Sequence, residues 1–349
     1  MANAERLMLW RQRQNPPVDK SAFIIHDLPT GSGMTLSMEA VMHFSDRLDN
    51  AVKAKGNPIC IGLDPRFEQL PKPVADAAIR KHGRCAEAVA EAFIAFNQAI
   101  IDAVVDIVPV CKPQIAFYEE YGWQGIRAYE ATVRYAKQKG MLVISDAKRG
   151  DIGATAAAYA RAHLGCRINP EDAGFEADAL TVNPYMGRDT LEPFLEVCAA
   201  AGRGIFVLVK TSNPGSGDLQ DVVTASIETV SERVADMVRA LGAKHYGECG
   251  LSDVGAVVGA TYPEQAEHLR RVMPDTIFLI PGYGAQGATA KDAAAGFRKD
   301  GRGAIVNNSR LLVFAYKLEA YATKYGEKDF AGATRAAALK MAEELRAAL

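Results

Sequence analysis

Residues 143–155, VISDAKRGDIGAT, place four charged side chains directly behind an apolar run. Asp146, Lys148, Arg149 and Asp151 are poor material for a hydrophobic core, which indicates a chemical role. Because alternate residues of a strand point to the same side, Asp146 and Lys148 are expected to face one way. A fixed ammonium group beside carboxylates can stabilise developing negative charge and deliver a proton. The alternative is a solvated salt-bridge cluster, which is worth only ~0 to 1 kcal/mol and needs no inward-facing strand end.

Polar side chains also end six other apolar runs of the sequence. These ends are Asp64, Lys112, Asn183, Lys210 with Thr211 and Ser212, the segment from Pro281 to Gly287, and the segment from Asn307 to Arg310. The carboxyl ends of parallel strands meet at one edge of an α/β fold, where its chemistry is found. The convergence of these ends predicts one site.

The elements that must position these residues follow from an alternation of short β-branched runs with longer Ala-rich amphipathic segments. The pattern predicts eight strand-then-helix units between residue 58 and about residue 325, with helices that include 86–104 and, last, 311–326. Nearly continuous apolar strands separated by helices imply a parallel sheet with covered faces. Eight units fit a closed (β/α)8 TIM barrel, and an open doubly wound sheet is the alternative.

Length and composition are consistent with one large globular domain. Of 349 residues, 49% are hydrophobic and 23% charged, and residues 1–35 mix charge, Pro and Gly without a sustained period. We therefore predict an N-terminal extension of uncertain structure over 1–35 and a single barrel domain over 36–349. The net charge of -2 provides no field that would attract nucleic acid or anionic lipid.

The six cysteines and the apolar runs point to an intracellular compartment. The cysteines are scattered without a C-x-x-C pair, which predicts reduced, structural thiols. No apolar stretch reaches the roughly 18 residues of a membrane span, and the N-terminus lacks a continuous signal-like apolar region. A cytoplasmic protein without a membrane partner is the expectation.

The segment PGYGAQG, residues 281–287, fits the dinucleotide fingerprint G-x-G-x-x-G. It follows the seventh predicted strand instead of the first, and no acid ends the next strand about 20 residues further on. Loops after strands seven and eight of a barrel commonly hold phosphate through backbone N–H groups. The sequence therefore favours a monophosphate site, with Gln286 and Arg310 as side-chain donors, over a dinucleotide site or a plain glycine turn.

Together these motifs resemble the orotidine 5'-monophosphate decarboxylase family. The family signature D-x-K-x-x-D-[IV]-x-x-T is matched by Asp146, Lys148, Asp151, Ile152 and Thr155. The further matches follow in the family's order from Ile59 to about Arg310: CIGLDPR with Asp64, CKPQIAFYEEYG with Lys112, PGYGAQG with Gln286, and NNSR with Arg310. The lengths of the 210–220 loop and of the helices are most similar to the longer bacterial branch.

The resemblance implies a lyase of de novo pyrimidine biosynthesis that converts orotidine 5'-monophosphate to uridine 5'-monophosphate without a metal or other cofactor. In that family Lys148 would stabilise the vinyl-type carbanion and deliver the proton that replaces CO2. Asp146, Asp151 and Lys112 would complete a Lys-Asp-Lys-Asp array. The resemblance further implies a homodimer in which Asp151 and Thr155 reach the neighbouring subunit's site. The implied substrate-binding residues are Asp64, Thr155, Thr211, Ser212, Pro281, Gln286 and Arg310.

Three other functions stay open on the sequence. A Mg-dependent sugar-phosphate decarboxylase or lyase of the same barrel superfamily would need further carboxylates, for which Glu119 and Glu120 are ambiguous candidates. A Schiff-base aldolase would use a strand-end lysine, although a lysine flanked by two aspartates should stay protonated. A non-catalytic phosphate-ligand binder would be expected to have lost Lys148 or an aspartate, and all are present.

Overall fold

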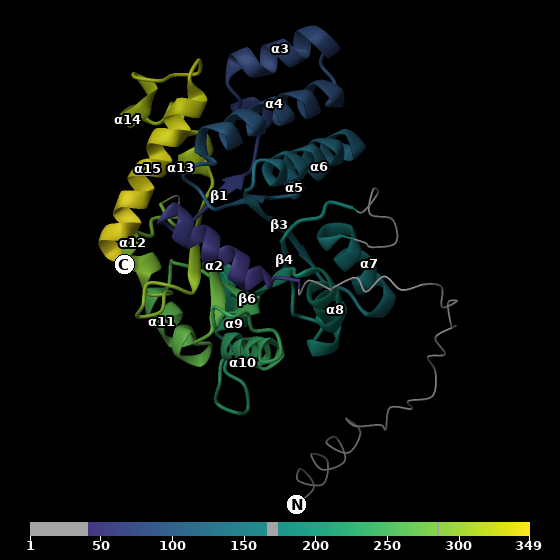
Figure 1. The fold of residues 1–349 in the computed structure, drawn as a ribbon, viewed down its shortest axis with the longest axis vertical. Coiled ribbons are helices and arrows are strands. Elements are labelled where there is room, and N and C mark those ends of the chain that lie inside the picture. Colours follow the sequence, from purple (N-terminus) through teal and green to yellow (C-terminus); the bar gives the residue numbers. More distant parts are fainter. Residues whose placement is uncertain (1–40, 166–173, 285) are drawn as a thin grey trace, which may run out of the picture. The chain divides into compact units, whose positions relative to one another are not determined.

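The computed structural model describes residues 41–165, 174–284 and 286–349. Within them eight parallel strands form a closed barrel in chain order (Figure 1). The strands are β1 (Ile59–Leu63), β2 (Val110–Pro113), β3 (Leu142–Arg149), β4 (Ala179–Val182), β5 (Gly204–Lys210), β6 (Ser252–Val258), β7 (Thr276–Ile280) and β8 (Ala304–Asn308). The predicted (β/α)8 barrel is confirmed, since β1 also pairs with β8. The predicted extension over 1–35, its boundary with the barrel domain, and Cys166 lie outside the described residues.

Helices cover the outer face of the barrel, and the longer ones among them turn an apolar stripe inward. The predicted helix 86–104 is confirmed as α4 (Ala86–Val104). The other helices before the last strand are α2 (Phe44–Lys55), α3 (Lys72–His82), α5 (Ala116–Glu119), α6 (Gly122–Gln138), α7 (Gly153–Leu164), α8 (Glu192–Ala201), α9 (Gly217–Gln220), α10 (Val230–Gly242), α11 (Pro263–Val272) and α12 (Ala290–Ala294). None of the helices in the described ranges combines the length and apolar character needed to cross a membrane.

The inside of the barrel is a packed apolar core at the amino ends of the strands. Phe44 and Leu48 of α2 pack into this core, and the ring of Phe44 meets that of Phe206 edge-on at 6.0 Å. The strand residues of the same cluster are Cys60, Val110, Ile144, Ala179, Phe206, Val257, Ile277, Leu279 and Ile305. Because α2 and this layer fill one end, the polar strand ends occupy the other.

The last unit differs from the expected single helix over 311–326, and that prediction is wrong. The chain forms α13 (Arg310–Val313), a 3-10 turn (Ala315–Lys317) and α14 (Glu319–Ala322), and α15 (Phe330–Ala348) then packs against α4 (Figure 1). Residues 312–316 are all buried. Five consecutive buried residues leave no polar face for one amphipathic surface helix. The covering role therefore passes to α15, where Phe330 stacks on Phe96 at 5.2 Å.

Candidate active site

The end of β3 is bulged at the first charged pair of the sequence. The β3–β4 register pairs Ser145 with Leu180 and Arg149 with Val182, so four steps along β3 match two along β4. Residues 146–148 therefore oppose Thr181. The Thr181 hydroxyl accepts the backbone N–H groups of Ala147 and Lys148, at 3.0 and 2.9 Å. The same hydroxyl donates to Oδ1 of Asp146 at 3.0 Å, so one buried side chain fixes the shape of the bulge.

Sequence reasoning did not identify Thr181, although it lies two residues before the predicted strand-end Asn183. Alternation along β4 was the available signal, because it places every second residue of the strand on the same side. Asn183 itself is exposed and accepts the backbone N–H of Tyr185 at 3.0 Å. It belongs to the turn after β4, and within the described ranges it forms no hydrogen bond with Lys112 or Lys148.

Two ammonium groups bind opposite oxygens of the Asp146 carboxylate. Nζ of Lys112 lies 2.5 Å from Oδ2, and Nζ of Lys148 lies 2.5 Å from Oδ1. Burial opposes the ionised form of Asp146, but the charges of Lys112 and Lys148 outweigh it and hold the pKa of Asp146 well below its usual range. The structure thus brings together three of the four predicted catalytic residues in one charged row.

The carboxylate of Asp64 borders this row from the end of β1. Its Oδ1 accepts the backbone N–H of Gln114 at 3.3 Å. Burial raises the pKa of Asp64, and the positive charge of Lys112 counteracts part of that effect. Burial also opposes the charge of Lys112, yet the carboxylates of Asp146 and Asp64 raise the pKa of Lys112 above its ordinary value. Lys112 therefore remains a cation between two acids.

Asp151 and Thr155 lie at the start of α7, apart from the charged row. Oδ1 of Asp151 accepts the backbone N–H of Ile152 at 2.8 Å, and among the described residues Asp151 has no ion-pair partner. Thr155 is exposed, and Ile152 beside them is 61% exposed. Within a single chain, the structure does not bring these two predicted residues to Lys148.

Gly150 allows close packing between the β3 and β4 ends. A Cβ atom at this position would lie 2.9 Å from the carbonyl oxygen of Asn183, so a larger residue would force the two segments apart. The left-handed backbone conformation at this strand end falls on Lys148, whose φ is +48°.

A cavity of about 150 Å³ opens beside Asp64 between the ends of β1, β7 and β8. It contains four of the predicted substrate-binding residues. Its lining is Asp64, Arg66, Phe117, Pro281, Gly282, Tyr283, Gln286, Asn307, Asn308, Ser309 and Arg310. Arg66 was not predicted, although it stands in the quoted CIGLDPR motif, and its guanidinium lies 5.0 Å from the centre of the Phe117 ring. Neither Arg66 nor Arg310 forms an ion pair among the described residues, which suits an anion site.

The two predicted binding residues in the loop after β5, Thr211 and Ser212, have different surroundings. The Gln220 side chain bonds both the backbone N–H and the hydroxyl of Thr211, at 2.9 and 2.8 Å. Lys210, which is 1% exposed, binds both oxygens of Asp221 at 2.7 and 2.8 Å. Thr211 and Lys210 are therefore held by their own loop and do not join the charged row.

Ser212 lies next to the cavity beside Asp64. A Cβ atom built on Gly282 would be 3.4 Å from Cβ of Ser212 and 3.0 Å from Oε1 of Gln286. Ser212 and Gln286 thus flank the same glycine although 74 positions separate them in sequence. The arrangement places a hydroxyl and an amide along one rim of the barrel mouth.

The two carboxylates considered for a magnesium site lie at the end of α5. Glu119 binds Arg149 at 2.5 Å, and Glu120 is exposed. Across the described ranges, the acidic and histidine side chains close enough to share an ion are His82, Glu87 and Glu91, on α3 and α4, and Glu87 already binds Arg127 at 2.5 Å. These residues do not lie at strand ends.

Comparison with known proteins places this arrangement in a family. The family model described as Orotidine 5'-phosphate decarboxylase / HUMPS family matches residues 57–325. A Rhodopirellula baltica protein named orotidine 5'-phosphate decarboxylase is 47% identical over 306 residues, which cover 88% of this chain and 100% of the relative. A Clostridium novyi protein of the same name is 42% identical over 302 residues, 86% of this chain and 97% of the relative.

Solved structures agree in fold along most of the chain. A Streptomyces avermitilis crystal structure matches with a TM-score of 0.71 and 33% identity over 90% of this chain and 99% of that one. The structure of Leishmania donovani OMP decarboxylase matches with a TM-score of 0.65 and 31% identity, over 88% and 98% of the two chains. The chain therefore belongs to the orotidine 5'-phosphate decarboxylase / HUMPS family, and its bacterial relatives of similar length are carboxy-lyases by name.

Proposed function

We propose that this protein decarboxylates orotidine 5'-monophosphate to uridine 5'-monophosphate, with Lys148 as the proton donor. The observation that carries the proposal is the row of Lys112, Asp146 and Lys148 at the barrel mouth, with both ammonium groups 2.5 Å from the central carboxylate. Loss of CO2 from the pyrimidine leaves a carbanion with no adjacent carbonyl to accept its electrons. A preorganised cation is the group that stabilises such a charge as it develops.

The protonation states of the row suit this task. The depressed pKa of Asp146 keeps it ionised at neutral pH, which fixes Lys148 at the edge of the row. Lys148 is 44% exposed at its side chain and faces the open mouth, whereas Lys112 is buried. Lys148 is thus the ammonium group that a bound pyrimidine can reach, and its proton would take the place of the departing CO2.

The cavity beside Asp64 would hold the phosphate end of the nucleotide, remote from the pyrimidine. Arg310 offers a planar fork to phosphate oxygens, and Gln286 adds an amide donor. Asp64, between the cavity and the row, is placed to accept hydrogen bonds from ribose hydroxyls. Binding energy from the phosphate can then be used to organise the reacting ring.

The exposed start of α7 supports a homodimer as part of this proposal. Asp151 and Thr155 lack partners from the charged row of their own chain, and Ile152 presents an apolar surface between them. A second copy of the chain would cover Ile152 and would receive Asp151 and Thr155 at its own barrel mouth. Asp151 would then complete the Lys-Asp-Lys-Asp array in trans.

The direct test is incubation of the purified protein with orotidine 5'-monophosphate while the loss of its ultraviolet absorbance is followed. Turnover is expected in buffer that contains EDTA, whereas dependence on added Mg²⁺ would favour the sugar-phosphate lyase type of chemistry. Absence of turnover with and without metal would sink the proposal. Turnover that persists undiminished in Lys148→Ala would overturn the proton-donor role but not the activity.

A further inference from the structure

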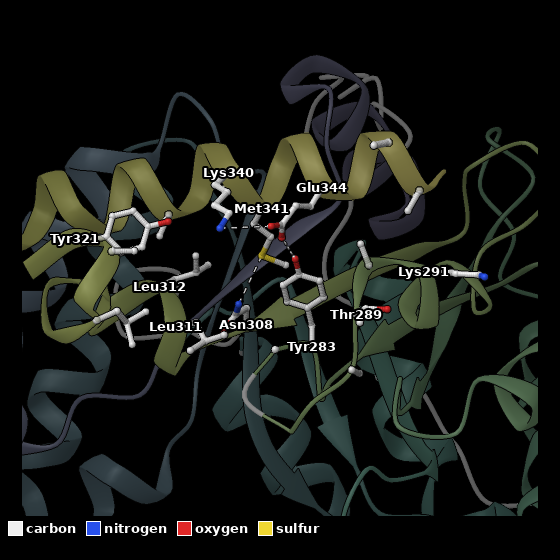
Figure 2. Close-up of a pocket in the computed structure, with 18 residues that line it drawn as sticks. Tyr283, Thr289, Lys291, Asn308, Leu311, Leu312, Tyr321, Lys340, Met341 and Glu344 are labelled. Atoms are coloured by element: carbon white, nitrogen blue, oxygen red, sulfur yellow. Dashed lines mark hydrogen bonds and ion pairs between the residues drawn. The ribbon is translucent and has the colours of Figure 1, made fainter.

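A groove of about 950 Å³ lies on the outer side of the segment that follows β7 (Figure 2). Its walls are apolar side chains of α13 and α15 and the segment itself. The labelled residues are Tyr283, Thr289, Lys291, Asn308, Leu311, Leu312, Tyr321, Lys340, Met341 and Glu344. Tyr283 and Asn308 also line the 150 Å³ cavity of the barrel mouth. These two side chains are therefore the partition between the groove and the proposed phosphate site.

Across the groove, the hydroxyl of Tyr283 donates a hydrogen bond to Oε2 of Glu344 on α15 (Figure 2). The Tyr283 residue is 7% exposed, while the Glu344 side chain is 45% exposed. Burial and the Glu344 carboxylate raise the pKa of Tyr283, so its hydroxyl keeps the donated proton. The contact joins the phosphate side of the barrel to a helix that carries none of the predicted site residues.

The helix on which Glu344 stands is fixed independently of this contact. The hydroxyl of Thr334 donates to the carbonyl of Leu312 at 2.9 Å. The guanidinium of Arg335 binds both oxygens of Asp106 at 2.6 and 2.7 Å. Because these contacts anchor the first half of α15, the Glu344 carboxylate in its second half is held in place as a hydrogen-bond acceptor.

The segment that bears Tyr283 packs closely against α13 and closes on itself. Gly284 has a φ of +68°, and a Cβ atom there would lie 2.3 Å from Cδ1 of Leu311. Its N–H donates to the carbonyl of Ala288 at 2.8 Å, which closes the segment on itself. Among the described residues 281–284 and 286–288, the Tyr283 hydroxyl forms the side-chain hydrogen bond that ties this closed turn to a surrounding helix.

We propose that Tyr283 and Glu344 are positioning residues for the phosphate grip, since their hydrogen bond holds the segment in the place from which Gln286 and Pro281 line the cavity. This inference rests on the proposed function. Neither residue needs to touch the substrate: the contact acts by fixing where the phosphate donors stand. A substrate that lacks the phosphate should not depend on it.

The test compares a nucleotide with the matching nucleoside. In Tyr283→Phe the ring that partitions the two cavities remains and only the hydroxyl is lost. We expect kcat/KM for orotidine 5'-monophosphate to fall about five- to tenfold, the effect of losing one hydrogen bond worth about 1 to 1.4 kcal/mol. The slow decarboxylation of orotidine, which has no phosphate, should change less than about twofold. Glu344→Ala should reproduce Tyr283→Phe, and Glu344→Gln, which keeps an acceptor, should recover most of the activity.

Lys340→Ala is the matched control, because Lys340 neighbours Glu344 at 3.8 Å but does not contact Tyr283. An equal loss for nucleotide and nucleoside in Tyr283→Phe would overturn the inference and indicate a general structural role, as would no loss for either. Calorimetric titration of each variant with uridine 5'-monophosphate and with uridine gives the same comparison without turnover. If wild-type protein shows no decarboxylation, the proposed function fails, while a selective loss of monophosphate affinity still supports the positioning role and an unchanged affinity contradicts it.

Discussion

The ammonium group of Lys148 lies 2.5 Å from Oδ1 of Asp146, although the two residues are separated by a single position on one strand. In a regular strand, residues at i and i+2 stand about 6.6 Å apart with parallel side chains. Here the bulge and the φ of +48° at Lys148 turn the backbone so that the two side chains meet. A non-glycine residue in this region costs about 1 to 3 kcal/mol, which is typical of sites that hold a group for chemistry.

Replacement of Lys148 by alanine should therefore remove catalysis while leaving the fold. We expect kcat for orotidine 5'-monophosphate to fall at least about a thousandfold, since both the cation and the proton are lost. Asp146 keeps Lys112 as a partner, so the affinity for uridine 5'-monophosphate should change less than about threefold. Single-turnover kinetics and calorimetry measure the two effects. Lys299→Ala, at an exposed position on the chain, is the control and should match wild type.

Thr181→Val tests whether one hydroxyl holds the bulge. The valine has nearly the same shape, but it removes the acceptor of two backbone N–H groups and one of the two donors to Oδ1 of Asp146, whose other donor is Lys148. We expect the free energy of unfolding to fall by about 1 to 3 kcal/mol and kcat to fall more than tenfold, about the result of losing the placement of one catalytic group. Urea unfolding and steady-state kinetics give the two numbers. Thr181→Ser should restore both, and a valine variant with normal kcat would contradict the assignment.

Mixing two inactive variants tests whether Asp151 serves the neighbouring subunit. In a dimer of Lys148→Ala with Asp151→Ala, one mouth carries both lesions and the other carries neither. After subunits exchange at equal concentration, half of the dimers are mixed, so activity should recover to about a quarter of the wild-type value. Activity that stays at the level of the separate variants would mean that Asp151 acts within its own chain or not at all.

His163 should make stability depend on pH. Burial, with the nearby charge of Arg149, lowers the pKa of His163 to about 3, and its Nδ1 lies 2.7 Å from Oγ of Ser145. The unfolded chain takes up a proton near the ordinary pKa of about 6.5, whereas the folded chain does not. The free energy of unfolding should therefore decrease as pH falls from about 6.5 toward 3, by up to about 1.4 kcal/mol per unit from this residue.

Urea unfolding of wild type and His163→Gln between pH 4 and 7 isolates this contribution. The carboxylates with depressed pKa values, Asp146 among them, are common to both proteins and cancel in the difference. The variant should be less stable at pH 7 and should show a shallower decline with acid. If the free energy of unfolding changed with pH equally in both proteins, the pKa of His163 would be the same in the folded and unfolded chains, which would contradict the prediction.

The fold was predictable because each strand of the barrel is a short apolar run and each early helix carries a one-sided stripe, as 86–104 shows. The final helices were not, since residues 312–316 are all buried and their neighbours in space come from α15 and β1, with Phe96 of α4 stacked on Phe314. Hydrophobic periodicity within a segment indicates that one of its faces is buried. It cannot indicate that other elements, distant in sequence, cover a segment on every side.

The charged row was predictable for the same local reason: Asp146 and Lys148 stand two apart on a strand, and Lys112 ends the strand before it. Thr181 was missed because a bulge changes which residue of β4 opposes which residue of β3. The bond between Lys210 and Asp221 depends on how an eleven-residue interval folds back, which composition does not encode. Local patterns therefore identified the members of the charged row but not the side chains that hold them.

In a closed ring of eight strands, β3 and β7 face each other across the opening. The ammonium groups belong to β2 and β3, while Pro281 and Gln286 follow β7. A ligand that contacts both the ammonium groups and the residues after β7 must be as long as the opening is wide. The barrel mouth would therefore select ligands by their length as well as by their chemical groups. Under the proposed function, fragments such as orotate or ribose 5-phosphate would engage one side each, and their covalent linkage would convert the second contact into an intramolecular one with high effective concentration.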